Sequence, residues 1–101
     1  MSTLGNEFQK TVFNLEAIRD SQEPASFDVL EKLDKLYAQQ IDLIDAAIKK
    51  ETDEYVSATM SMGEAAKITQ EAIDNLAKLE EAIKKVANAI GKVGLLLVAV
   101  T

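Results

Sequence analysis

The densest group of side chains that could do chemistry is acidic. Five carboxylates fall close together in the chain: Asp42, Asp45, Glu51, Asp53 and Glu54. Carboxylate oxygens are the ligands that Mg²⁺ and Ca²⁺ prefer, so one interpretation is a divalent cation site. The spacing is not that of an EF-hand loop, and acids on a helix commonly form a solvated face. We favour the solvated face and predict no metal site.

Other groups that could carry catalysis are scarce. The chain has no His, no Cys and no Trp, which removes the usual near-neutral general base and the thiol nucleophile. Ser57, Thr59 and Ser61 have no neighbouring base to activate a hydroxyl. Tyr37 and Tyr55 lie near hydrophobic stripes, so we expect them to pack there. We therefore expect a protein that is not an enzyme and needs no cofactor.

Charge excludes a further class of partner. The formal net charge is −6, from 17 acidic and 11 basic residues. Nucleic-acid binding needs clustered Lys and Arg that displace phosphate counterions. Arg19 is the sole arginine and the lysines are dispersed, so no nucleic-acid partner is expected.

The charge is also distributed unevenly. Residues 1–60 carry twelve acidic and six basic side chains, whereas from Ala82 onward all the charges are lysines. The most apolar run, 93–100, is shorter than the roughly 20 residues that a bilayer requires. The first residues lack the basic and apolar regions of a signal peptide. These features predict a cytoplasmic protein, with export without a signal peptide as an open alternative.

Hydrophobic spacing predicts the first two helices. Residues 4–20 carry an apolar stripe at three- and four-residue intervals, after which Pro24 ends the pattern and Ser26 is a candidate N-cap. A second helix is predicted over 27–56. Its stripe, which we assign to the core or to an oligomer interface, consists of Leu30, Leu33, Tyr37, Ile41, Ile44 and Ile48.

A turn is predicted at 57–61. Ser61 and Glu64 have the spacing of a capping box, in which a hydroxyl and a carboxylate each bond the other residue's backbone amide. Met60 and Met62 would then flank the turn. The alternative is one uninterrupted helix through this region, because none of these residues forbids a helix.

A third helix is predicted over 62–90, with a tail at 91–101 whose structure the pattern leaves open. A heptad seam runs along the helix, and no member of it is charged. The seam residues that we assign to the core or interface are Leu76, Leu79, Ile83, Val86 and Ile90.

These elements predict an all-α fold and a single domain over 1–101. Residues 27–56 and 62–90 are expected to form an antiparallel hairpin, to which 4–20 adds a further helix at the edge. Two helices cannot cover apolar faces this broad, so we expect two hairpins to pair into a homodimeric four-helix bundle or a larger one.

The basic, apolar tail gives two functional hypotheses. Its candidate contact residues are Lys92, Leu95, Leu96, Leu97 and Val98. The favoured hypothesis is a small, non-enzymatic interaction protein that self-associates through long amphipathic helices and binds another protein. In the alternative, an export-related or membrane-surface protein places the tail lysines at lipid headgroups and buries the apolar run.

Overall fold

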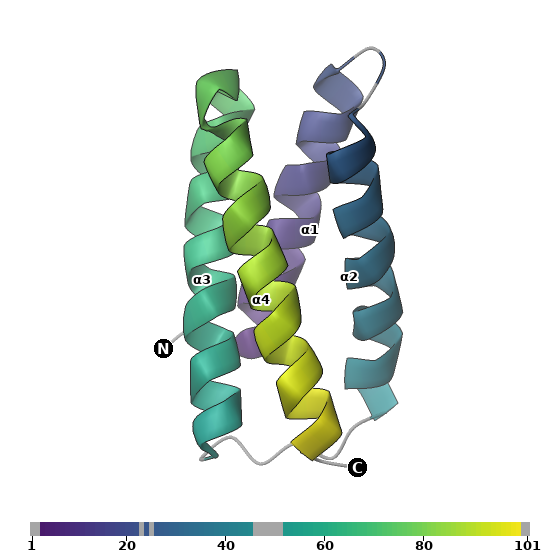
Figure 1. The fold of residues 1–101 in the computed structure, drawn as a ribbon, viewed down its shortest axis with the longest axis vertical. Helices are drawn as coiled ribbons and strands as arrows, with labels where there is room; N and C mark the ends of the chain where they lie inside the picture. Colours follow the sequence, from purple (N-terminus) through teal and green to yellow (C-terminus); the bar gives the residue numbers. More distant parts are fainter. Residues whose placement is uncertain (1–2, 23, 25, 46–51, 100–101) are drawn as a thin grey trace.

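The computed structural model describes residues 3–22, 24, 26–45 and 52–99. Within these ranges the chain forms four α-helices, α1 (Leu4–Ser21), α2 (Phe27–Asp45), α3 (Asp53–Asp74) and α4 (Leu79–Ala99), with a 3-10 helix, η1 (Leu76–Lys78), between the last two. The helices alternate in direction along the chain (Figure 1). The radius of gyration, 13.1 Å, is that of a compact domain of this length. The predicted helical bundle is confirmed.

The four helices pack in a ring in which α2 and α3, although consecutive in the chain, are not neighbours. The most extensive contacts join α3 to α4 and α1 to α3, and smaller ones join α2 to α4 and α1 to α2. Consequently α1 and α3 run side by side in the same direction, while α2 and α3 lie on opposite sides of the bundle (Figure 1). Consecutive pairing is therefore α1 with α2 and α3 with α4. The expected hairpin between 27–56 and 62–90 does not form.

Short polar side chains set the helix ends. Thr3 accepts a hydrogen bond from the Asn6 amide at the start of α1, and Ser26 accepts one from the Val29 amide at the start of α2. The predicted N-cap at Ser26 is therefore confirmed. Thr52 caps α3 in the same way, and acidic side chains follow it in the first turn, where they complement the helix dipole.

The predicted helix and turn boundaries between 45 and 79 are wrong. Residues 57–61, predicted to bend, lie inside α3, where the Thr59 hydroxyl donates to the Tyr55 carbonyl at 2.8 Å. This local bond satisfies the hydroxyl inside a helix. The helix begins instead at Asp53, after the extended N-cap residue Thr52, so the predicted helix over 27–56 is not continuous; residues 46–51 lie outside the described part.

The predicted helix over 62–90 is also interrupted. Asn75 has an extended backbone, with φ −143° and ψ 94°, and its side chain accepts a hydrogen bond from the Ala77 amide at 3.1 Å. Asn competes with helical hydrogen bonding in this way. The reversal after α3 lets α4 fold back along it, which no single helix could do. The tail is helical as far as Ala99.

Each helix buries a stripe with alternating three- and four-residue steps, the spacing of a heptad seam. In α4 the buried positions are Ala82, Val86, Ala89, Val93 and Leu96; in α3 they include Ala58, Met62, Ala65, Thr69 and Ala72. Small side chains therefore make up much of the buried faces of both helices. Small residues at a contact let two helices approach closely.

The N-terminal helix belongs to the core and not to the edge. Leu15 and Ile18 are completely buried, and the other apolar side chains on the same face of α1 are buried too. A polar seam accompanies them: the Asn14 amide donates to the Ala66 carbonyl at 3.0 Å and to the Thr69 hydroxyl at 3.1 Å. These buried bonds fix the register of α1 on α3, because an unpaired amide there would cost free energy.

Candidate interaction surface

Helix α2 has two apolar faces, and only one of them is covered. The inner face buries Val29, Leu33 and Leu36 against the bundle. The second face carries Phe27, Leu30 and Ile41, whose exposed fractions are 75%, 42% and 65%. We call these three residues the outer stripe. Because 14 residues are nearly four helical turns, Phe27 and Ile41 project in the same direction, with Leu30 beside them.

The stripe has an acidic centre. Asp34 lies one heptad after Phe27 and one heptad before Ile41, and it is exposed. The structure gives it no ion pair within the described ranges, whereas the neighbouring Glu31 contacts Lys32 at 2.9 Å and Lys35 at 3.9 Å. These lysines lower the pKa of Glu31, the hydrogen bond from Lys32 contributing most. The outer stripe is thus an apolar face about 21 Å long with one carboxylate at its middle.

The predicted core stripe of the second helix therefore divides between two faces. Leu33 is buried and Tyr37 is half-buried, but Leu30 and Ile41 face solvent. The side chain of Ile44 and the whole of Ile48 lie outside the described residues. Sequence reasoning missed Phe27, although its heptad relation to Ile41 was a usable signal. The prediction took the face of this helix that carries Leu30 and Ile41 as its buried face, which is wrong.

The predicted seam of the third helix divides in a similar way. Val86 is buried, Leu79, Ile83 and Ile90 are partly buried, and Leu76 is exposed. Ala82 and Ala89 are buried instead, and the buried face of α3 is likewise rich in alanine. Apart from Val86, the seam that we predicted from its large residues therefore lies beside the buried face and not on it.

The tail residues do not form a single surface. Leu96 is completely buried and Leu97 is partly buried, whereas Leu95 and Val98 are exposed. Lys92 lies in a cleft of about 220 Å³ between the beginning of α3 and the end of α4. Two exposed apolar side chains are fewer than the broad face with which an amphipathic helix enters a lipid interface.

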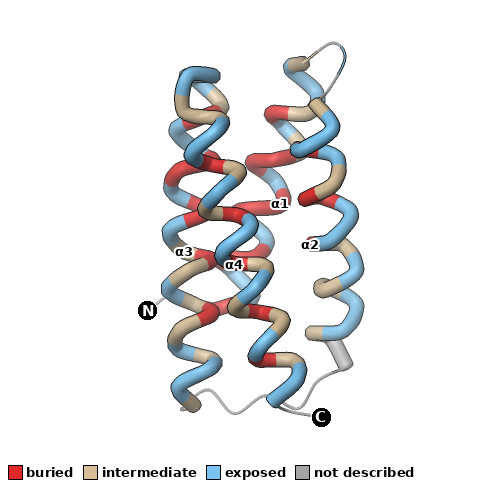
Figure 2. Tube along the Cα trace, in the orientation of Figure 1, coloured by how far each residue is buried: buried red, intermediate tan, exposed pale blue. Residues whose placement is uncertain are grey.

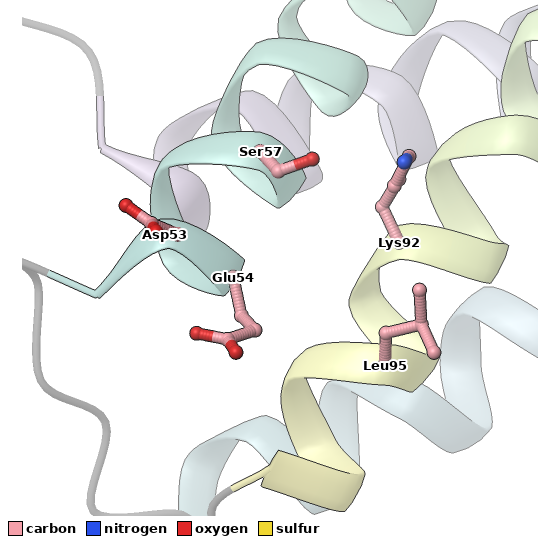
Figure 3. Close-up of a pocket in the computed structure, with 5 residues that line it drawn as sticks. All are labelled: Asp53, Glu54, Ser57, Lys92 and Leu95. Atoms are coloured by element: carbon pink, nitrogen blue, oxygen red, sulfur yellow. The ribbon is translucent and has the colours of Figure 1, made fainter.

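The cleft at Lys92 contains charged groups that do not converge. It is lined by Asp53, Glu54, Ser57, Lys92 and Leu95. Figure 3 shows the Glu54 carboxylate and the Lys92 ammonium pointing in opposite directions. No ion pair joins these groups, so within the described ranges the cleft offers no assembled acid, base or anion site.

The other chemical candidates take structural positions. The Tyr37 hydroxyl donates to Glu16 at 2.6 Å, and the Tyr55 hydroxyl accepts from the Leu4 amide at 3.1 Å. Met62 is buried in the core while Met60 is exposed. Among the residues that the structure describes, no three carboxylates come together as metal ligands.

None of the described helices is long and apolar enough to span a bilayer. Comparison with protein-family models, curated proteins and solved structures finds no match for this chain.

Proposed function

We propose that this chain is a small, non-enzymatic interaction protein whose α2 outer stripe binds a second copy of the chain. The observation that carries the proposal is the exposure of three large apolar side chains on one face of one helix. Single exposed apolar residues are ordinary on protein surfaces, whereas several on one face of a helix favour an interaction site.

The order of residues along the stripe favours a second copy over an unrelated partner. Two α2 helices that cross antiparallel about Asp34 place Phe27 of one copy opposite Ile41 of the other. The same register places Leu30 opposite Ala38, a small exposed residue. Each pair thus occurs twice, once on either side of a two-fold axis, as in an isologous dimer that uses the same patch on both copies.

The expected dimer is weak. One helix face is smaller than the roughly 800 Å² that each partner contributes to a standard interface, and two Asp34 carboxylates approach each other at the crossing point. We therefore expect a dissociation constant in the micromolar range or above. With such a dissociation constant, the fraction of dimer changes with the concentration of the protein.

The test compares Ile41→Lys with Phe13→Lys by sedimentation equilibrium over a series of concentrations. Both substitutions replace an exposed apolar side chain, and Phe13, 70% exposed, lies on α1 away from the stripe. The wild type and Phe13→Lys should dimerise, and Ile41→Lys should remain at the monomer mass of 11.0 kDa. A wild type that stays monomeric, or equal dimerisation of both variants, contradicts the proposal.

A further inference from the structure

Ion pairs join α3 to the part of the chain that returns along it. The two helices bury residues along most of their lengths (Figure 2), and the paired side chains lie partly exposed beside this contact. The Glu71 carboxylate contacts the Lys78 ammonium at 3.3 Å, and the Glu64 carboxylate contacts the Lys85 ammonium at 3.3 Å. The two acids are seven residues apart, and so are the two lysines. Seven residues are about two helical turns, so the pairs form a regular series, which we call the ion-pair ladder.

The next step of the ladder brings Ser57 opposite Lys92. Each of them lies seven residues beyond its counterpart in the pair of Glu64 with Lys85. Both line the cleft of about 220 Å³ between the beginning of α3 and the end of α4. Lys92 forms no ion pair in the part of the chain that the structure describes. A serine therefore occupies the position at which the other two steps have a glutamate.

The Ser57 hydroxyl is accessible and uncommitted. The residue is partly exposed, and among the described residues its hydroxyl makes no hydrogen bond, whereas the Thr59 hydroxyl donates to a backbone carbonyl. Figure 3 shows the Ser57 oxygen pointing across the cleft toward α4. The carboxylates of Asp53 and Glu54 point away from Lys92 in the same view. An acidic group attached to the Ser57 oxygen would thus extend toward the lysine.

We propose that Ser57 is a phosphorylation site and that its phosphate completes the ion-pair ladder at Lys92. In this reaction a protein kinase uses a nucleoside triphosphate. The Ser57 oxygen forms a bond to the γ-phosphorus, the bond from that phosphorus to the bridging oxygen breaks, and the hydroxyl proton passes to a base of the kinase. The nucleoside diphosphate leaves. The phosphoserine carries a charge of about −1.5 to −2 at neutral pH and three strong acceptor oxygens.

Two opposing electrostatic effects act on the attached phosphate. Attraction to Lys92 stabilises the contact between the two helices, and repulsion from Asp53 and Glu54 weakens it. Both carboxylates are exposed, where water and salt screen their repulsion, whereas Lys92 is half-buried. Attraction therefore prevails, and phosphorylation holds the last turns of α4 more firmly against α3. The site lies on α3 and α4, so it does not depend on the outer stripe of α2.

Hydrogen exchange followed by NMR tests this link on chains that carry serine or phosphoserine at position 57. The phosphate should slow the exchange of the 93–97 amides about two- to fivefold, the range for one partly exposed ion pair. Lys92→Gln should abolish the slowing, because it removes the cation that faces the phosphate. Lys84→Gln is the matched control: it removes an exposed lysine at another position of α4, and the slowing should persist.

Mass spectrometry of the chain isolated from the cells that produce it tests whether the modification occurs. Fragment spectra should place a phosphoryl group on Ser57. The proposal is overturned if the peptide that contains Ser57 is recovered only in unmodified form. It is also overturned if phosphoserine leaves the exchange of 93–97 unchanged, or if the slowing persists in Lys92→Gln.

Discussion

The hydroxyl of Tyr37 shows how one polar atom contributes to this fold. Its 2.6 Å hydrogen bond to the Glu16 carboxylate raises the pKa of Tyr37, and partial burial raises it further. The neutral phenol is the donor in this bond, so the folded state favours the protonated form. The bond is therefore a link between α1 and α2 that depends on pH.

The sign of that dependence gives a prediction. Because the folded-state pKa is raised, the stabilisation is fully present below the ordinary tyrosine pKa of about 10 and is lost as pH rises through the raised value. Tyr37→Phe should be less stable by about 1 kcal/mol near neutral pH, and the difference from wild type should disappear at alkaline pH. Urea unfolding followed by circular dichroism measures it.

The matched control for this measurement is Tyr55→Phe. That substitution removes a hydroxyl that accepts a hydrogen bond from a backbone amide, and it leaves the bond between Tyr37 and Glu16 in place. A stability difference between wild type and Tyr37→Phe that stays constant from neutral to alkaline pH would show that the hydroxyl makes no pH-dependent contribution.

At the scale of the helix, small side chains occupy two of the buried positions of α4, Ala82 and Ala89. Ala82 is completely buried and Ala87, five residues later on the outer side of α4, is exposed. Ala82→Leu forces extra volume into the core and should lower the free energy of unfolding by about 1–3 kcal/mol. Ala87→Leu should change it by less than about 0.5 kcal/mol. Thermal or urea unfolding of the two variants compares them directly, and equal effects would contradict close packing at Ala82.

The sequence patterns identified helical segments, but they did not predict where the chain reverses or which face of each helix is buried. The all-helical class, the helical character of residues 4–20 and the cap at Ser26 all follow from local patterns, because apolar spacing and capping act within a few residues. The break at Asn75 was missed because the heptad spacing continues through it, and a repeat cannot distinguish one helix from two that fold back.

The choice of face failed for a different physical reason. Both α2 and α4 carry two apolar stripes, and which stripe is buried depends on the side chains of the facing helix. In α4 Ala82 and Ala89 are buried, whereas Ile83 and Ile90 are only partly buried. In α2 the same ambiguity left Ile41 exposed and created the candidate surface. Local patterns carry no information about such long-range complementarity.

At the scale of the whole molecule, the bundle closes without a partner. The expectation of a dimer rested on too few helices to cover the apolar faces, and the insertion of α1 into the core removes that need. The basis for self-association is now the outer stripe alone. We therefore expect a folded monomer that associates reversibly. Substitutions at exposed positions of α2 should weaken this association without unfolding the monomer, because they leave the inner face and the core intact.

The absence of cysteine from the chain allows the most direct test of this association. Asp34→Cys places one thiol at the proposed two-fold axis, where two copies bring their helices close enough for a disulfide. Phe13→Cys places a thiol at another exposed site as a control for random collision. Under mild oxidation, the formation of covalent dimer is followed by non-reducing electrophoresis. We predict that Asp34→Cys forms the dimer much faster than Phe13→Cys, and equal rates would contradict self-association through the outer stripe.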